Sequence, residues 1–152
     1  MIQGGRGVIR TFLEKRGYRS VPEDFYGKIE EWKDWYINGV DKMHTRTVYN
    51  GKTVVKQEIK SLGMAKTVAE TWANLLMNEK VQINVGNEHS NDVLHDILKD
   101  NKFQTNANRL CELYFALGTG AFVEYIGKDE VQIDYIQADL IFPITWSSKG
   151  VE

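Results

Sequence analysis

The hydrophobic pattern is clearest between residues 62 and 85, where a helical repeat is followed by an alternating one. Large apolar side chains recur at three- and four-residue spacing and predict the buried face of a helix: Met64, Val68, Trp72, Leu75 and Leu76. A narrower stripe of small residues, beside which a neighbouring element can pack closely, accompanies it: Ala65, Ala69 and Ala73. Residues 81–85 alternate apolar and polar side chains, which predicts a half-buried strand.

Two helices are expected before residue 40. Apolar residues on one face predict a short helix over residues 6–15, ended by Gly17. Ser20 and Pro22 favour the start of a second helix, because a side-chain oxygen and a proline suit the first turn. Two acids follow in that turn, Glu23 and Asp24. We expect this helix to end just before Gly39.

Two more helices are expected in the second half of the chain, with Ser90 and Thr105 as their N-caps. The glycines of Gly118-Thr119-Gly120 should end the later one. Together the helical stripes predict a structural core made of Phe25, Ile29, Trp32, Tyr36, Val68, Trp72, Leu75, Leu76, Leu110, Leu113, Tyr114 and Leu117.

Hairpin signals separate these helices. Asn50-Gly51 lies between two β-prone runs, and a two-residue turn there would place Tyr49 opposite Lys52 and Thr47 opposite Val54. A second hairpin is expected around residues 127–129, followed by a third extended run that Pro143 interrupts. The fold class is therefore α+β, with four to five amphipathic helices and antiparallel β-hairpins.

Composition indicates one ordinary domain over residues 1–152, with a basic N-terminal helix, residues 1–19, at its periphery. A chain of 152 residues and 17.5 kDa can bury roughly two thirds of its unfolded surface. The net charge of −2 argues against a surface wholly committed to polyanions. Cys111 is the sole cysteine, so no disulfide can form within the chain. No apolar run is long enough to span a membrane.

Candidates for chemistry are few, and we predict no catalytic, cofactor-binding or metal-binding residue. Gly118-Thr119-Gly120 follows a helix and lacks the lysine of a phosphate loop. His89 and His95 lie six residues apart, which places them on different helix faces. Cys111 has no evident base partner. Two groups of carboxylates have the spacing of a solvated surface: Glu30, Glu31 and Asp34, and Asp129, Glu130 and Asp134.

Cations are concentrated near the N-terminus and in the first hairpin, where they could face phosphate groups. Charge runs more often mark a solvated surface, and the aromatic residues follow core spacing instead of alternating with the cations. The candidate nucleic-acid contacts are Arg6, Arg10, Lys15, Arg16, Arg46, Lys52 and Lys56.

An ordered series of phrases is more specific than any of these motifs. The chain contains, in order, SVPEDFYGKIEEWKDWYING, the VYNGKTV hairpin, LGMAKTVAETWANLLMNEKVQINV, ALGTGAFVEYI and IDYIQADLIFPITW. From about Tyr18 to Trp146 it resembles the N-terminal part of tailed-bacteriophage portal proteins, in the group found in phages of Gram-positive hosts. The most specific parts are Met64-Ala65-Lys66, Trp72 to Leu76, Asn78-Glu79-Lys80, Tyr135, Ala138-Asp139 and Pro143.

This resemblance implies a structural virion component, a subunit of the head-tail connector ring through which double-stranded DNA is packaged and ejected. It implies no enzymatic activity and no cofactor. The implied partners are other portal subunits in the ring of the full-length parent, capsid and scaffolding proteins, the terminase, head-completion proteins, and double-stranded DNA that passes through the channel without sequence specificity, with no membrane. The implied location is the capsid vertex of the virion, after assembly in the host cytoplasm.

Portal subunits of this group are several hundred residues long, so we expect the chain to be an N-terminal fragment. It would supply the outer, wing-like region and its capsid or subunit contacts, and would lack the stem helices. The residues alone also leave two other functions open. The first is a small DNA-binding or protein-interaction module that uses the basic N-terminus and hairpin. The second is a metal-dependent hydrolase built on the acidic and histidine clusters.

Overall fold

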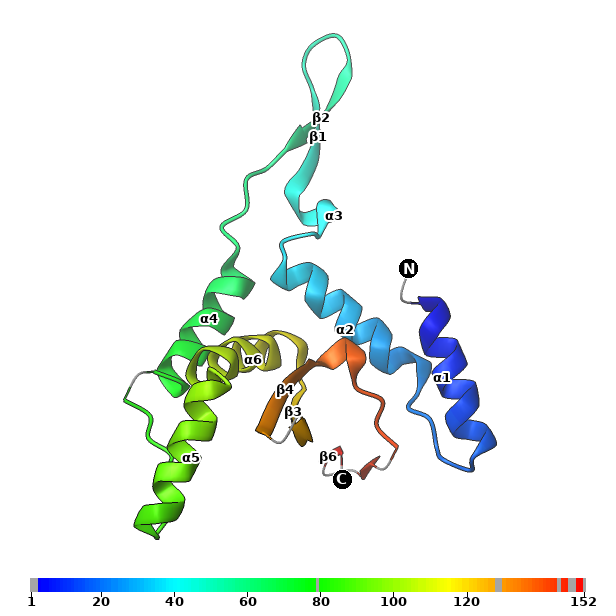
Figure 1. The fold of residues 1–152 in the computed structure, drawn as a ribbon. Coiled ribbons are helices and arrows are strands. Elements are labelled where there is room, and N and C mark those ends of the chain that lie inside the picture. The colour runs from blue at the N-terminus through cyan, green and yellow to red at the C-terminus, as the bar shows by residue number, and fades with distance from the viewer. Residues whose placement is uncertain (1–2, 79, 128–129, 145, 148–149, 152) are drawn as a thin grey trace.

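A computed structural model describes residues 3–78, 80–127, 130–144, 146–147 and 150–151 (Figure 1). Helices and antiparallel hairpins alternate along this part of the chain, which confirms the α+β class. In chain order the elements are α1 (Gln3–Lys15), α2 (Glu23–Tyr36), α3 (Asp41–His44), β1 (Thr45–Tyr49), β2 (Val54–Glu58), α4 (Met64–Leu76), α5 (Glu88–Asp100), α6 (Phe103–Leu117), β3 (Gly120–Gly127), β4 (Glu130–Gln137), the 3₁₀ turn η1 (Ala138–Leu140), β5 (Trp146–Ser147) and β6 (Gly150–Val151).

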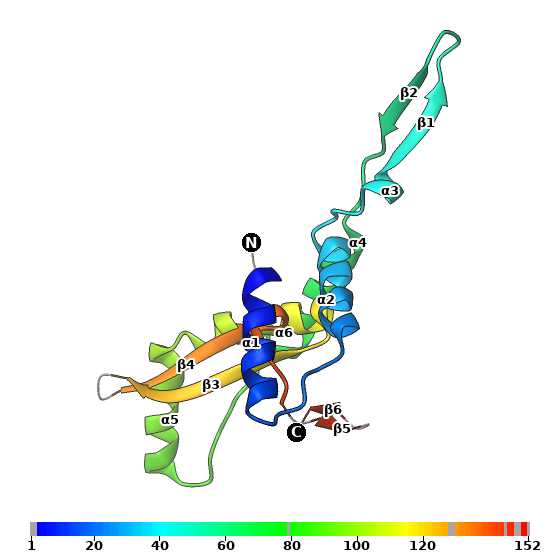
Figure 2. The same cartoon turned by 90° about the vertical axis from the view of Figure 1, so that its right-hand side faces the viewer.

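Helix α6 lies at the centre of the body, between α4 and the β3–β4 hairpin, and also contacts α2 (Figures 1 and 2). Ile29 of α2, Leu117 of α6 and Ala138 of η1 form the buried cluster. Leu110 is buried nearby. The prediction of a core position is therefore confirmed for Ile29, Leu110 and Leu117, and three other predicted core residues are half-buried: Phe25, Tyr36 and Leu113.

The end of α5 is joined to the β3–β4 hairpin through Asn101. Its side-chain amide donates to the Val131 carbonyl at 2.9 Å, and its Oδ1 accepts from the Ile133 backbone N–H at 2.8 Å. These bonds satisfy backbone groups on the outer edge of β4, which among the described strands pairs with β3 alone. Phe103 stacks on Phe122 across the same junction, with ring centroids 5.8 Å apart.

The predicted helix starts are wrong in detail. Pro22 is the N-cap of α2, and its side chain has no atom that could accept a capping hydrogen bond, while the Ser20 hydroxyl donates to Glu14. Asn87 caps α5, and its Oδ1 accepts from the backbone N–H of Ser90, the residue that we expected to be the cap. Helix α6 begins two residues before Thr105.

The predicted helix end at Gly118 is confirmed. Gly118 is the C-cap of α6 with φ +80°, a backbone conformation that favours glycine. A Cβ added there would lie 3.0 Å from the ring of Trp32, so the glycine also makes room for α2. At the end of α2 it is Asn38, not Gly39, that takes the left-handed conformation.

The predicted register of the first hairpin is wrong. Tyr49 pairs with Val54 and Thr47 with Lys56, so residues 50–53 form a four-residue loop. Asn50 explains the longer loop, because its Oδ1 accepts from the backbone N–H groups of two loop residues, Lys52 at 3.0 Å and Thr53 at 2.9 Å.

Residues 81–85 form no strand, which corrects that prediction. A strand needs a partner for its backbone groups, and here the Val85 N–H donates to the side chain of Asn91. The expected hairpin around residues 127–129 is present as β3–β4, although residues 128–129 lie outside the described part. The third extended run is interrupted by η1, and Pro143 lies in an irregular segment before the short β5–β6 pair.

The predicted orientation of α4 is also wrong. Ala69 and Ala73 face α6 and are buried, whereas the large residues face outward: Val68, Trp72, Leu75 and Leu76. Trp72 is 52 % exposed and Ala73 is 0 % exposed. The small side chains let the two helices approach closely, and Asn108 Nδ2 donates to Asn74 Oδ1 across the contact at 3.0 Å. Two other predicted core residues, Trp32 and Tyr114, are exposed as well, at 43 % and 51 %.

The chain has much more surface than a compact monomer of its mass. Its accessible surface is 11889 Å², whereas a folded monomer of this mass is expected to expose roughly 7,900 Å². The fold therefore buries about half of the unfolded surface instead of the expected two thirds. Surfaces that remain open in the isolated chain are the natural candidates for function.

Candidate interaction surfaces

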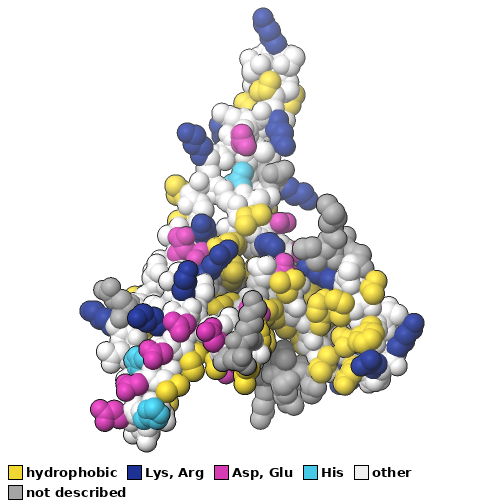
Figure 3. Space-filling view, viewed as in Figure 1, with side chains coloured by type: hydrophobic (Ala, Val, Ile, Leu, Met, Phe, Trp, Pro, Cys, Tyr) yellow, Lys and Arg dark blue, Asp and Glu magenta, His cyan; other side chains and the backbone are white. Residues whose placement is uncertain are grey.

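The β1–β2 hairpin forms an arm that projects away from the body (Figure 2). Every side chain of β2 is exposed, so the arm has no apolar core of its own. Lys52 lies in the loop at the tip and Lys56 on β2. Arg46 donates from Nε to Gln57 Oε1 at 2.9 Å and stays on the surface of the arm. Figure 3 shows a cationic side chain at the tip. The arm thus brings together the three hairpin cations that we predicted as nucleic-acid contacts.

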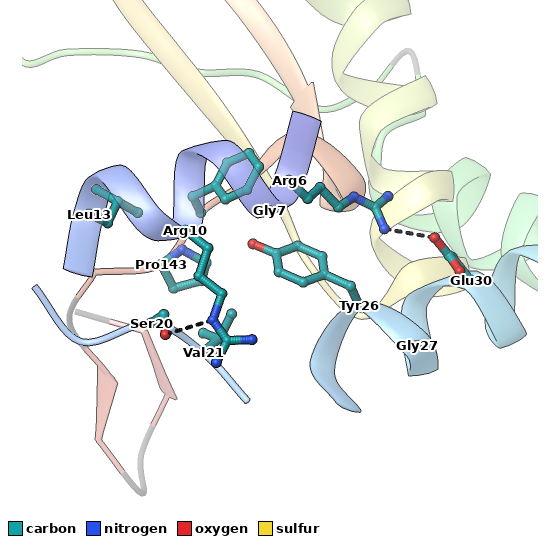
Figure 4. A pocket seen from close by; sticks show the side chains of 11 residues that line it. Arg6, Gly7, Arg10, Leu13, Ser20, Val21, Tyr26, Gly27, Glu30 and Pro143 are labelled. Atoms are coloured by element: carbon teal, nitrogen blue, oxygen red, sulfur yellow. Dashed lines mark hydrogen bonds and ion pairs between the residues drawn. The ribbon is translucent and has the colours of Figure 1, made fainter. Parts of the chain in front are cut away.

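Polar bridges hold α1 against α2 (Figure 4). Arg6 Nη1 donates to Glu30 Oε1 at 2.7 Å, and its guanidinium lies 5.0 Å from the centroid of the Tyr26 ring. Burial raises the pKa of Tyr26, whose hydroxyl donates to the Ile141 carbonyl at 2.9 Å. A cavity of about 490 Å³ remains between the two helices, lined also by Pro143.

The other end of α1 is fastened by Arg10, Glu14 and Ser20. Arg10 Nε lies 3.0 Å from Glu14 Oε1 and 3.2 Å from Ser20 Oγ, which itself donates to Glu14 at 2.6 Å. The hydrogen bond from Ser20, followed by that from Arg10, lowers the pKa of the Glu14 carboxyl. Arg6 and Arg10 are therefore occupied in holding α1, whereas the other two predicted contacts on this segment are exposed: Lys15 and Arg16.

The outward side of α4 is an exposed apolar surface. We call it the α4 apolar face and define it as Met64, Val68, Trp72, Leu75, Leu76 and Phe115. The rings of Trp72 and Phe115 lie 6.0 Å apart, which joins α4 to α6 across this face. Contiguous exposed apolar surface on a soluble protein usually marks a contact with another molecule.

Helix α5 carries an acid at every fourth position, and four such acids share one face: Glu88, Asp92, Asp96 and Asp100. All of these side chains are exposed. Acids and histidines gather over α5 in Figure 3. Like charges four residues apart repel one another along a helix, so this row weakens α5 slightly in isolation.

A buried carboxylate links α2 to η1. Asp139 is 3 % exposed, and its Oδ2 lies 3.2 Å from Lys33 Nζ. Its Oδ1 has no hydrogen-bond partner among the described residues. A second long-range bond joins Tyr36 of α2 to Glu112 of α6, and burial, followed by this bond, raises the pKa of Tyr36 to about 12. Sequence patterns missed both pairs, because their members are far apart in the chain.

Within the described ranges, the other candidates for chemistry do not come together as a reactive site. Among the described side chains no group of three or more histidine, cysteine or acidic residues is placed to hold a metal ion. His95 lies 3.2 Å from Asn84 Oδ1, and Glu30 pairs with Arg6. Burial raises the pKa of Cys111, which leaves its thiol less reactive. The prediction for Asp129 lies outside the described residues.

No described helix is both long and apolar enough to cross a membrane.

Comparison with known proteins identifies the family. The family model described as "Phage portal protein, SPP1 Gp6-like" matches residues 21–152, which is most of the chain. No curated protein and no solved structure gives a significant match. The matched region contains the arm, the α4 apolar face and the acidic row of α5, and leaves out only α1 and the segment after it. The chain therefore belongs to the phage portal protein family of the SPP1 Gp6-like type.

Proposed function

We propose that the chain is a ring subunit of the phage portal and contributes its outer, wing-like region. Family membership makes it a structural component of the capsid vertex that takes part in DNA packaging. The finer assignment, a wing that contacts neighbouring subunits and the capsid, goes beyond the family match. So does the assignment to phages of Gram-positive hosts.

The main support for a ring subunit is the amount of surface that the isolated chain leaves open. The accessible surface exceeds that expected for a compact monomer of 17.5 kDa by about 4,000 Å². Interfaces in obligate assemblies bury about 2,000–5,000 Å² in total, so this excess is of the size that assembly would cover. Large exposed side chains on α4, such as Trp72, supply the apolar part.

Electron microscopy of the full-length subunit that contains this chain tests this function. We expect ring-shaped particles with a central channel. Particles without a ring, or monomers alone at every concentration, would contradict the proposal. The further partners expected of a portal are the terminase, scaffolding proteins and head-completion proteins, and binding of each to the assembled ring is a separate experiment.

A second proposed function, carried by the same protein, is contact with DNA through the β1–β2 arm. The support is that Arg46, Lys52 and Lys56 project from the body on an arm without a core of its own. Cations that neutralise phosphates give binding that weakens as salt rises and does not depend on base sequence. A gel-shift titration on duplex DNA at increasing salt tests it. Absence of binding at low salt would refute this contact and leave the ring function standing.

A further inference from the structure

Helix α1 presents an exposed apolar face, on which the Arg16 guanidinium lies 4.5 Å from the centroid of the Phe12 ring. Val8 is 69 % exposed and Phe12 is 51 % exposed, with Ile9 between them. We call these three residues the α1 apolar face. The contacts that hold α1 to the body lie elsewhere on the helix and are largely polar, at Arg6 and Arg10. An amphipathic helix fixed through polar contacts, with its apolar face open, is suited to bind another surface.

The α4 apolar face is a second open surface, and the helix that carries it lies across the body from α1. Figure 1 shows α1 on one side of the body and α4 and α5 on the opposite side, with α2 and α6 between them. Viewed from the α1 side in Figure 2, α1 is in front of the body. Because the two helices lie on opposite sides of the body, their apolar faces cannot meet within one subunit, and a contact between them joins different copies head to tail.

The charges around the two faces are complementary. On the α1 side the exposed cations are Lys15 and Arg16, at the C-terminal end of the helix, whereas Arg6 and Arg10 are paired with Glu30 and Glu14. On the opposite side, α5 carries its row of acids with only one lysine, Lys99. Two copies in a head-to-tail arrangement would bring a basic side against an acidic side, whereas a symmetric contact would bring like charges together.

We propose that the α1 apolar face of one subunit docks on the α4 apolar face of the next copy of this chain. This contact rests on the proposed ring function and specifies how neighbouring subunits meet. A head-to-tail contact repeats around a ring and uses both faces of every subunit. The surface excess of about 4,000 Å² is large enough for two standard faces of about 800 Å² each per subunit.

Cysteine crosslinking between copies tests the contact. Both proteins carry Cys111→Ser, which removes the native thiol. One of them also carries Val8→Cys, and the other carries Leu75→Cys and an affinity tag. Both sites are exposed, at 69 % and 62 %, so each variant is expected to fold. A short bismaleimide added to the mixture should crosslink a Val8→Cys chain to a Leu75→Cys chain. Each variant alone should give at least tenfold less dimer.

The matched control replaces Val8→Cys with Val54→Cys on the arm, a valine of similar exposure at 66 %. This pair should give no dimer above background. Dimers of Val8→Cys with itself, or equal yields from the control pair, would overturn the docking contact.

Electron microscopy of the same crosslinked samples separates this contact from the ring function. Rings that form without the mixed crosslink would overturn the docking contact and leave the ring function intact. A mixed crosslink in particles that are not rings would support the contact and contradict the ring. Charge reversal gives a second readout, because Lys15→Glu with Arg16→Glu should reduce the mixed dimer at least tenfold. An unchanged yield would overturn the role of charge.

Discussion

Lys33 and Asp139 join α2 to η1 by an ion pair in which the lysine is partly exposed and the carboxylate is buried. The two charged atoms lie 3.2 Å apart, and the Asp139 side chain is 4 % exposed. A buried carboxylate is costly unless it is paired. This pair connects residues that are more than a hundred positions apart, beside the Ile29–Leu117 cluster.

Replacing Lys33 with methionine should destabilise the fold by about 3 kcal/mol, because Asp139 then stays buried without its cation. This loss is at the lower end of what breaking a buried ion pair costs, because the Lys33 side chain is partly exposed to solvent. Urea unfolding followed by circular dichroism measures the change in free energy. The control is Lys28→Met, which removes the exposed pair with Asp24 and should cost less than about 0.5 kcal/mol. Equal effects of the two changes would contradict the account of Asp139.

Gly118→Ala should destabilise the protein by about 2 kcal/mol. Residue 118 has φ +80°, and the new Cβ would lie 3.0 Å from the Trp32 ring. Gly27→Ala is the matched control, because Gly27 lies inside α2 with open space around it. That change should stabilise the protein by about 0.5–1 kcal/mol through helix propensity. Thermal unfolding of both variants should therefore shift in opposite directions, and a shift in the same direction would be incompatible with this geometry.

Ser20→Ala should raise the pKa of Glu14 towards its ordinary value, because the Ser20 hydroxyl is the main cause of the lowered pKa. A carboxyl with a lowered folded-state pKa contributes stability above its unfolded pKa and loses it as the pH falls through the folded pKa. The contacts that Glu14 makes with Ser20 and Arg10 should therefore weaken as the pH falls below the ordinary pKa of a glutamate side chain. An NMR titration of the Glu14 carboxyl measures the shift. Ser61→Ala, whose hydroxyl bonds Asn38, should leave it unchanged.

Neutralising the arm should weaken DNA binding in a salt-dependent way. Changing Arg46, Lys52 and Lys56 to glutamine together should lower the slope of log affinity against log salt by about 2–3, since each phosphate that a cation neutralises contributes roughly 0.9. Fluorescence anisotropy with a labelled duplex measures the slope. The control is a second triple glutamine variant, with its changes outside the arm at Lys66, Lys80 and Lys99. Its slope should equal that of the wild type. Equal slopes for the two triple variants would remove the arm from the DNA-contact hypothesis.

Much of the helical structure could be predicted, because apolar side chains repeat at helical spacing along each segment. The direction in which the α4 stripe faces could not. Amphipathicity says which residues share a face, and a face that meets another chain looks the same in the sequence as one that meets the core. Ala73 was the useful signal, since a stripe of small residues permits the close approach to α6 that α4 makes.

The remaining errors have local or long-range causes. The hairpin register depends on the Asn50 side chain, whose bonds to two backbone N–H groups lengthen the loop beyond two residues. Residues 81–85 had a strand pattern and lacked a partner strand, which no local pattern can supply. Asp139 is buried through contact with Lys33, far away in the sequence. Of the candidate surfaces, the cationic arm could be predicted from the sequence. The α4 apolar face was missed, because its residues on α4 were expected in the core.

The mass of the protein in solution tests the central claim most directly, namely that the open apolar surface of this portal chain is covered by assembly. Light scattering coupled to size exclusion should give a multiple of 17.5 kDa for the wild type. Trp72→Glu should shift the protein towards 17.5 kDa with an unchanged circular dichroism spectrum, whereas Tyr125→Glu on β3 should not. A wild-type protein that stays at 17.5 kDa at every concentration would contradict the claim.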